Sequence, residues 1–409
     1  MQDNEKKPAL RFKGFTDPWE QRKLGELVEI GDIDHRMPET VDVGIPYLMT
    51  GDFCGTNELN FNGVKLISEI EYNQLSQKIK PEQGDILFAR YASVGTVRYV
   101  DFTRKFLISY SCAIIKKGKK INSQYLYHFI TSDEAQKQIK LQINTGSQSN
   151  IGIDSMKNNI LVQMPLIDEQ VQIANMLTNL DHLITLHQRK YEKLVNIKKS
   201  MLDKMFPKNG ASVPEIRFKG FTDPWEQRKL TEFANFFSGL TYTPNDIREI
   251  GVLVLRSSNV INGEIVDADN VYVNPEVVNS ENVKEGDIVV VVRNGSRSLI
   301  GKHAQIKRFM PDTVIGAFMT GIRSECPAFT NALLNTPHFD EEVSMNMGAT
   351  INQITGYMFS KMEFRVPTVD EQRQLGAFFE NLDALITLHQ RKLEKLQNIK
   401  KSCLEKMFV

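Results

Sequence analysis

The chain has 409 residues, 41% of them hydrophobic, and its 50 lysines and arginines balance 50 aspartates and glutamates. No apolar run approaches the roughly 18 residues of a membrane-spanning helix, no apolar signal segment opens the chain, and the four cysteines lie too far apart for zinc-binding pairs. We therefore expect a soluble, cytoplasmic protein with reduced cysteines. The neutral total gives no sign of a polyanionic partner, but it is compatible with one basic face.

An internal repeat organises the chain. The block RFKGFTDPWEQRKL at 11–24 returns unchanged at 217–230, and the segment 166–206 returns at 368–408 with most positions identical. A long internal repeat indicates two copies of one structural unit. The predicted parts are 1–165, a first block with an α/β domain; 166–206, a central helix; 207–214, a linker rich in helix breakers; 215–367, a second block with its domain; and 368–409, a C-terminal helix.

Both blocks lead into segments with the same order of predicted elements. Asp17 followed by Pro18 predicts the start of a short helix, and Trp19 and Trp225 are predicted to be structural anchors. Within 25–164, β-type runs such as GIPYLM and GDILFARY alternate with Gly, Asn and Asp turns, and a helix is expected near 123–143. In the second copy, EGDIVVVVRNGSRSLIGKHAQI corresponds to QGDILFARYASVGTVRYV. We expect two α/β domains that keep one frame but differ in side chains.

Apolar residues recur at steps of three and four along both repeated helices, in a narrow stripe typical of a coiled coil. At about 1.5 Å per residue, each helix forms a rod of about 57 Å. We expect the two rods to pair antiparallel under a pseudo-twofold internal repeat. An alternative, in which each helix packs on a separate globular core, remains open. The predicted helix–helix contacts are Leu177, Leu180, Ile184, Tyr191, Leu194, Phe379, Leu382, Ile386, Leu393 and Leu396.

The sequence contains no recognisable catalytic motif. It lacks the GxxxxGK[ST] phosphate loop, the N/D-P-P-aromatic motif of amino-methyltransferases, HExxH, GxSxG and any Cys/His zinc spacing. The seven histidines are scattered. We therefore predict no catalytic residue, no metal site and no cofactor in this chain.

Polar and basic loops follow the GDILFA and GDIVVVV runs, and a second polar loop lies further along each domain. Arg and Asn side chains can bond two atoms of a guanine or adenine edge, whereas Ser, Thr and Lys suit phosphates. An ordinary solvated turn is the competing interpretation for any single residue. The predicted DNA contacts are Arg90, Tyr91, Ser93, Thr96, Arg98, Ser147, Gln148, Asn150, Arg293, Asn294, Ser296, Arg297, Lys302, Thr350, Asn352 and Gln353.

The paired RFKGF…W-E…L blocks and the DEQ…LD.LI…HQRK.EKL…KKS.L..MF helices resemble one known family. It is the family of DNA specificity (S) subunits of type I restriction–modification systems. The resemblance covers essentially the whole chain, and the close copying of the repeats is similar to the staphylococcal members.

That resemblance implies a non-catalytic subunit with target recognition domains at 25–164 and 231–366. Each domain would read one half of an asymmetric, split site in double-stranded DNA, and the helices would set the spacing of the halves. The helices would also dock two modification subunits, which bind S-adenosylmethionine and methylate adenine. Two restriction subunits would add translocation and cleavage with ATP and Mg. The alternative hypothesis is a protein-binding coiled-coil scaffold with two adaptor domains and no DNA target.

Overall fold

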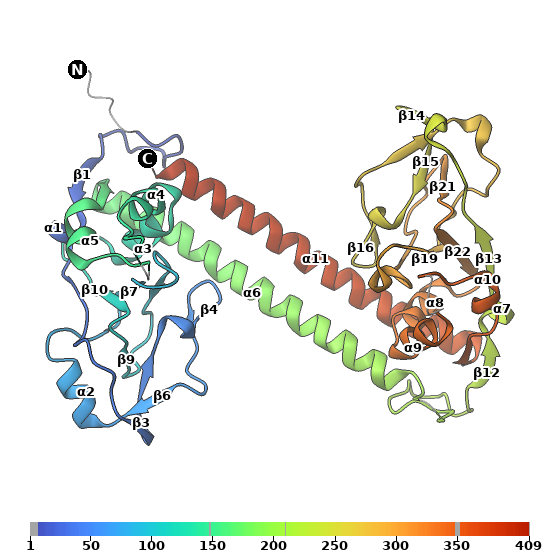
Figure 1. Ribbon diagram of the computed structural model, residues 1–409, viewed down its shortest axis with the longest axis horizontal. Coiled ribbons are helices and arrows are strands. Elements are labelled where there is room, and N and C mark those ends of the chain that lie inside the picture. Colours follow the sequence, from blue (N-terminus) through green and yellow to red (C-terminus); the bar gives the residue numbers. More distant parts are fainter. Residues whose placement is uncertain (1–6, 147–148, 209, 348–351, 409) are drawn as a thin grey trace. The chain divides into compact units, whose positions relative to one another are not determined.

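The structure, a computed structural model, describes residues 7–146, 149–208, 210–347 and 352–408. It divides into unit 1, Met1–Arg189 with Gln390–Val409, and unit 2, Lys190–His389 (Figure 1). Each unit holds one α/β domain and a part of each of two long helices, α6 (Ile167–Met205) and α11 (Val369–Met407). The prediction of two α/β domains with two long helices is therefore confirmed.

A four-stranded antiparallel sheet with two buried faces forms the centre of the domain in unit 1. Side chains alternate along each strand, so Phe88 and Ala113 pack toward α3, while Leu87 and Ile114 pack against a second, three-stranded sheet. Burial of both faces explains why the strand runs are continuously apolar. The sheets are β2 (Ile30–Gly31), β10 (Cys112–Ile115), β7 (Ile86–Ala89) and β8 (Val97–Tyr99); β6 (Lys65–Ile67), β3 (Thr40–Leu48) and β9 (Leu107–Ile108); β1 (Glu20–Lys23) and β11 (Leu161–Met164); and β4 (Phe53–Cys54) and β5 (Glu58–Leu59). The shorter helices are α1 (Leu24–Leu27), α2 (Glu69–Leu75), α3 (Ser123–Thr131), α4 (Asp133–Leu141) and α5 (Ile153–Asn159).

Unit 2 repeats this plan, including a parallel strand pair in the second sheet, β3 with β9 in unit 1 and β15 with β21 in unit 2. The sheets are β13 (Ala234–Ser238), β22 (Met319–Ser324), β19 (Ile288–Val291) and β20 (His303–Gln305); β14 (Ile247–Arg248), β18 (Val271–Val273), β15 (Val252–Leu255) and β21 (Thr313–Ile315); β12 (Glu226–Lys229) and β23 (Glu363–Val366); and β16 (Val260–Ile261) and β17 (Glu264–Ile265). The shorter helices are α7 (Leu230–Phe233), α8 (Pro327–Leu334), α9 (Pro337–Asn346) and α10 (Gly356–Phe359).

The repeated block anchors the first turn of each long helix. The Glu169 carboxylate, buried in α6, accepts two hydrogen bonds from Arg11, at 2.7 and 2.8 Å, and one from Trp19 Nε1 at 3.3 Å. A carboxylate in this position is also favoured by the helix dipole. The copied residues make the same contacts in unit 2: Arg217, Trp225 and Glu371. This constellation gives the identity of the two blocks a structural reason, and both tryptophans are buried anchors as predicted.

The apolar stripe of each long helix packs on a domain core as well as beside the other helix. In unit 1, Leu177 belongs to the domain core together with Met407 and Phe408, and in unit 2 Phe379 belongs to it together with Phe206. Both interpretations of the stripe therefore hold in part. Of the predicted contacts, five are buried, Leu177, Ile184, Phe379, Leu382 and Leu393, and five are partly buried, Leu180, Tyr191, Leu194, Ile386 and Leu396.

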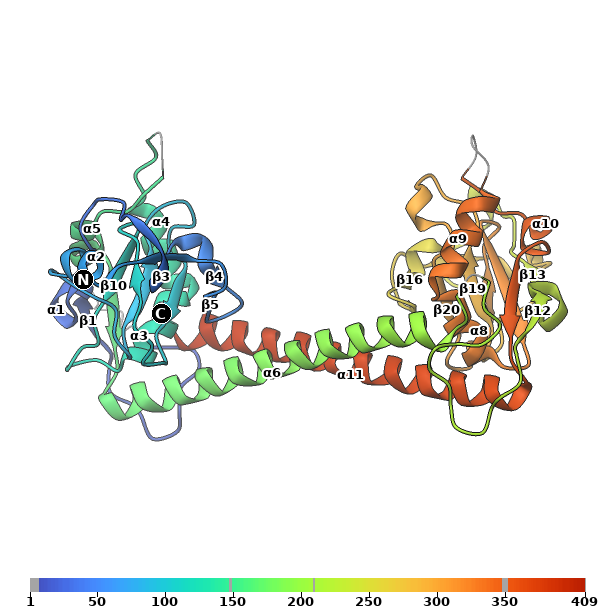
Figure 2. The same ribbon diagram turned by 90° about the horizontal axis from the view of Figure 1, so that it is seen from below.

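A lysine–aspartate pair links the two helices within each unit. Lys400 Nζ lies 2.5 Å from Asp181 Oδ1 in unit 1, and Lys198 Nζ lies 2.6 Å from Asp383 Oδ1 in unit 2. In each unit the start of one helix lies beside the end of the other, so the paired segments run antiparallel (Figure 2).

Two local predictions are wrong. No helix starts at Asp17, because the chain stays extended after Pro18 and Glu20 begins strand β1, which pairs with β11. The helix expected over 123–143 is two helices, because Ser132 takes an extended backbone conformation and its side chain caps α4 by accepting from Ala135 N.

Candidate nucleic-acid interface

In unit 2, the two predicted polar loops meet beside the end of β19. Ile354 N donates to the Val292 carbonyl at 2.8 Å, and the next residue, Arg293, forms an isolated β-bridge with Gln353. Asn352 Nδ2 adds a hydrogen bond to the Gly295 carbonyl at 3.1 Å. The β-type pairing holds the two loops side by side at one edge of the domain.

Unit 1 repeats this junction with other side chains. Ile151 N donates to the Arg90 carbonyl at 3.1 Å, and the next residue, Tyr91, forms an isolated β-bridge with Asn150. The same hydrogen-bond pattern makes Tyr91 the structural counterpart of Arg293, and Asn150 the counterpart of Gln353. Arg90 therefore does not occupy the place of Arg293.

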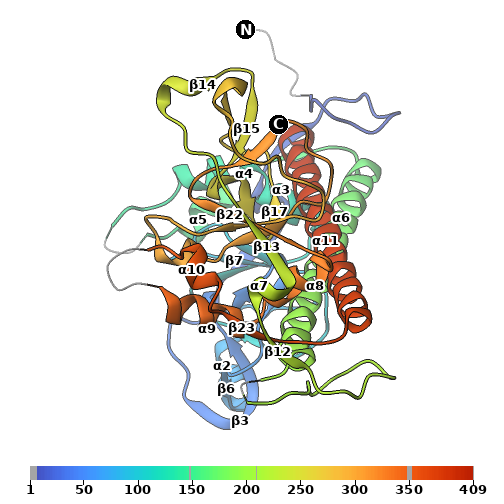
Figure 3. The same ribbon diagram turned by 90° about the vertical axis from the view of Figure 1, so that its right-hand side faces the viewer.

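These loops leave each domain on the side away from the long helices. In unit 1 the segments flanking residues 147–148, and in unit 2 those flanking residues 348–351, emerge opposite to α6 and α11 (Figures 2 and 3). Each unit thus separates a variable polar edge from the copied helical side.

Arg293 is the exposed basic residue at the unit 2 junction, and Phe318 supports it. The guanidinium lies 5.1 Å from the centre of the Phe318 ring, a cation–π distance. The Phe318 carbonyl accepts hydrogen bonds from Val292 N at 3.0 Å and Arg293 N at 3.2 Å. Asn294 is fixed beside it through Ser257 Oγ at 3.2 Å.

The arginines of unit 1 are engaged within the fold. Arg90 is buried, donates through Nε to the Ile151 carbonyl at 3.0 Å and forms an ion pair with Asp32. Arg98 is buried, and burial lowers the pKa of its guanidinium. Its donors reach four backbone carbonyls, at Val97, Glu58, Cys54 and Gly55. The structure gives both side chains a role in holding loops together, which differs from the predicted contact with DNA.

The predicted DNA contacts divide by accessibility. Exposed residues are Ser93, Arg293, Ser296 and Arg297; partly exposed residues are Tyr91, Thr96, Asn150, Asn294, Lys302, Asn352 and Gln353; buried residues are Arg90 and Arg98. Ser147, Gln148 and Thr350 lie outside the described residues.

The sequence reasoning missed aromatic residues in the turns before β10 and β22. In unit 2 this is Phe318, and in unit 1 it is Tyr110, whose ring stacks on His35 with 5.1 Å between ring centres. His35 in turn bonds Asp32 at 2.8 Å. The sequence signal that could have revealed both residues is an aromatic residue within a short turn between two apolar strands.

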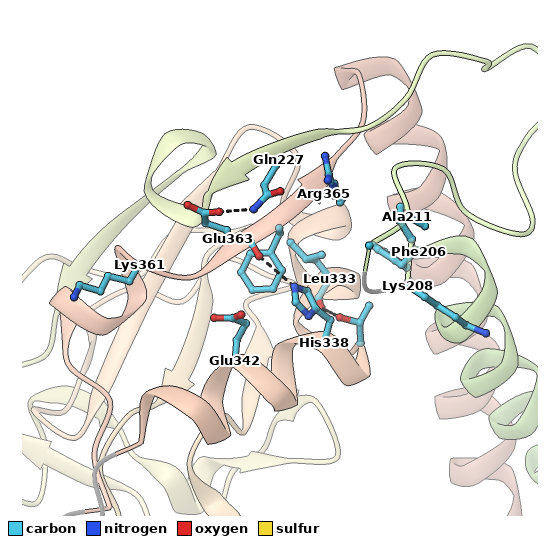
Figure 4. Close-up of a pocket in the computed structure, with 14 residues that line it drawn as sticks. Phe206, Lys208, Ala211, Gln227, Leu333, His338, Glu342, Lys361, Glu363 and Arg365 are labelled. Carbon is cyan, nitrogen blue, oxygen red and sulfur yellow. Dashed lines mark hydrogen bonds between the residues drawn. The ribbon is translucent and has the colours of Figure 1, made fainter.

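A cavity of about 360 Å³ in unit 2 lies between the linker at Lys208 and the β12–β23 pair (Figure 4). There His338 Nε2 bonds the Glu363 carbonyl at 3.2 Å, and Gln227 bonds the Glu363 side chain. Among the described residues no group of three His, Cys, Asp or Glu side chains is placed to hold a metal ion. No helix in the described ranges has the length and apolar character needed to cross a membrane.

The described chain thus holds two α/β domains of one plan, each joined to copied helical segments and each with different polar residues at the matched edge. The model of the type I restriction modification DNA specificity domain matches residues 16–196 and 222–398. The chain therefore belongs to this family of specificity proteins.

Several relatives and a solved structure agree with this assignment. The chain is 26% identical over 261 residues to the type I restriction enzyme MjaVIII specificity subunit of Methanocaldococcus jannaschii, a match that covers 59% of this chain and 60% of that relative. A putative MjaX specificity subunit of the same organism is 21% identical over 95% of this chain and 92% of its own length. The StySPI specificity subunit of Salmonella potsdam is 25% identical over 43% of this chain and 40% of its own length. The S subunit of M. genitalium shares the fold, with a TM-score of 0.64, 16% identity, and coverage of 98% of this chain and 99% of that one.

Proposed function

We propose that this chain is the DNA-reading specificity subunit of a type I restriction–modification complex in the cytoplasm. In this proposal each domain reads one half of a split, asymmetric site in double-stranded DNA. The observation that carries it is that the two domains share one frame but place different side chains at equivalent positions. The β-bridge between Tyr91 and Asn150 in unit 1 corresponds to the β-bridge between Arg293 and Gln353 in unit 2. A protein with two different readers in one frame needs this combination of constant and variable parts.

The exposed leucines that recur in α6 and α11 are evidence for two identical partner subunits. Leu183 and Leu186 in α6, and their copies Leu385 and Leu388 in α11, are 43–46% exposed although they are large and apolar. Folding alone gives no reason for copying exposed leucines, whereas two docking sites for one type of partner do. We propose two modification subunits, which supply S-adenosylmethionine and adenine methylation. Two restriction subunits would add the ATP- and Mg-dependent steps, and this chain would hold no cofactor.

Methylation mapping tests the proposal directly. A genome carrying this chain with its modification partner is compared with one lacking the chain, and we expect one new split motif with adenine methylated on opposite strands in its two halves. Exchanging residues 25–164 for the corresponding domain of another specificity subunit should change one half only. A change in both halves would contradict modular reading. No new methylation with an active partner would favour the protein-binding scaffold.

A further inference from the structure

Position 91 of unit 1 and position 293 of unit 2 occupy the same place in the repeated frame. Tyr91 follows Arg90, whose carbonyl accepts a hydrogen bond from Ile151 N, and forms a β-bridge with Asn150. In the same way, Arg293 follows Val292, whose carbonyl accepts from Ile354 N, and forms a β-bridge with Gln353. One domain places a tyrosine there and the other an arginine. A difference at a matched place beside the loops is what two distinct half-sites require.

The exposed Arg293 side chain is held in place by contacts with Phe318. Its guanidinium lies over the Phe318 ring at 5.1 Å, and its backbone is bonded to the Phe318 carbonyl at 3.2 Å. The Phe318 ring is 56% exposed, although the carbonyl of this residue is held by two backbone hydrogen bonds. No carboxylate of the described residues forms an ion pair with Arg293. A guanidinium confined in this way loses less conformational freedom when it meets a target.

The chemistry of the guanidinium selects one base edge. Its planar fork donates two parallel hydrogen bonds, and guanine presents two acceptors, O6 and N7, in the major groove. Adenine pairs one acceptor with one donor there, and so leaves one arginine donor unmatched. The tyrosine at position 91 has a single hydroxyl and lacks this double donor.

We propose that Arg293 reads a guanine in the half-site of unit 2, with Phe318 as its positioning residue, and that unit 1 lacks this contact because Tyr91 stands in its place. This inference rests on the proposed function and adds to it which base is read, guanine, and which residue reads it, Arg293. It also states that the two half-sites differ at the matched position.

The test is methylation mapping with the complete complex. Arg293→Ala should make one G·C position of one half tolerant of other bases, with discrimination lowered about 10- to 100-fold. Phe318→Leu should relax the same position to a smaller extent, and Phe318→Tyr, which keeps the ring, should preserve the motif. Exchanging residues 231–366 for another such domain identifies the half that belongs to unit 2. The matched control is Arg308→Ala, which also removes an exposed arginine from unit 2. Arg308 lies away from the loop junction, because its neighbour Lys307 lines a small hollow beside α11.

Three outcomes separate the possibilities. Arg293→Ala would overturn the inference if methylation fell equally at all sites with the motif unchanged, since this marks a phosphate contact. Relaxation at an A·T position, or in the half belonging to unit 1, would overturn it as well. Absence of any motif with the unaltered chain would instead contradict the proposed function itself.

Discussion

At the scale of single residues, we expect His128 to make the stability of unit 1 sensitive to acid. Its Nε2 lies 3.0 Å from Thr178 Oγ1, and burial, with a smaller effect of Lys400, lowers its pKa to about 3. An unfolded histidine has a pKa of about 6.5, so below that pH the unfolded chain binds a proton that the folded chain excludes. Stability should therefore fall as the pH drops, by about 2 kcal/mol at pH 5.

The measurement is the free energy of unfolding between pH 7 and pH 5 for the unaltered chain and for His128→Gln. The glutamine variant should lose less stability over this range, because it has no proton to bind. Burial raises the pKa of neighbouring Asp181, which acts in the opposite direction, but that carboxylate is present in both proteins. Equal pH slopes for the two proteins would show that His128 titrates normally in the folded state.

The arginines show how far a site residue can be predicted from sequence. Both Arg90 and Arg293 follow an apolar strand run, and the pattern of that run does not fix which residue faces outward at its end. A shift of one residue reverses the facing side chain, and the hydrogen bonds of Ile151 and Ile354 place Tyr91, not Arg90, at the junction. Arg98 is fixed by carbonyls some 40 residues earlier in the chain, at Cys54, Gly55 and Glu58, which no local pattern reveals.

At the scale of elements, the first turn of α6 depends on the contact between Glu169 and the repeated block. Glutamine at this position would bring an NH₂ group toward the donors of Arg11 or Trp19 and would leave the Arg11 charge without its partner. We expect Glu169→Gln to destabilise unit 1 by about 2–4 kcal/mol. The measurement is thermal unfolding, with Glu371→Gln as the same change in unit 2.

Glu20→Gln is the control for that change. Glu20 also pairs with an arginine, Arg22 at 2.9 Å, but both side chains are exposed, so the melting temperature should stay nearly unchanged. If Glu169→Gln were as mild as Glu20→Gln, the buried contact would not be what fixes the helix start.

Elements with a long, regular pattern were predictable, and short ones were not. The stripe of α6 and α11 persists over many turns, so their helical character follows from spacing alone. The break at Ser132 depends on one side chain capping the next helix, and the strand at Glu20 depends on pairing with β11, about 140 residues later. Pairing between distant segments decides such cases, and it leaves little trace in local sequence.

At the scale of the whole molecule, the repeat predicts the number of partners. Leu183 and Leu186 form one exposed pair and Leu385 with Leu388 forms its copy, so each pair should hold one modification subunit. Replacing Leu183 and Leu186 together by glutamine removes apolar area that a partner would bury. Because each leucine is already more than half buried in the free chain, a partner can bury only the 43–46% that is exposed. At roughly 1.5–3 kcal/mol for full burial of a leucine, the pair contributes about 1.3–2.7 kcal/mol, so we expect binding at that site to weaken about 10- to 100-fold.

The mass of the purified complex, measured by native mass spectrometry or light scattering, distinguishes the outcomes. We expect two partners on the unaltered chain, one on either double variant, and none on the variant with all four leucines changed. The control is Leu141→Gln, which alters a leucine that is 82% exposed but lies at the end of α4, outside the copied segments, and should retain both partners. Loss of both partners from a single pair would mean that the two sites are coupled rather than separate. If both partners were retained when all four leucines are changed, these leucines would not form the docking surface. The docking surface would then be assigned to another copied part of the chain, such as the exposed residues of the RFKGFTDPWEQRKL blocks.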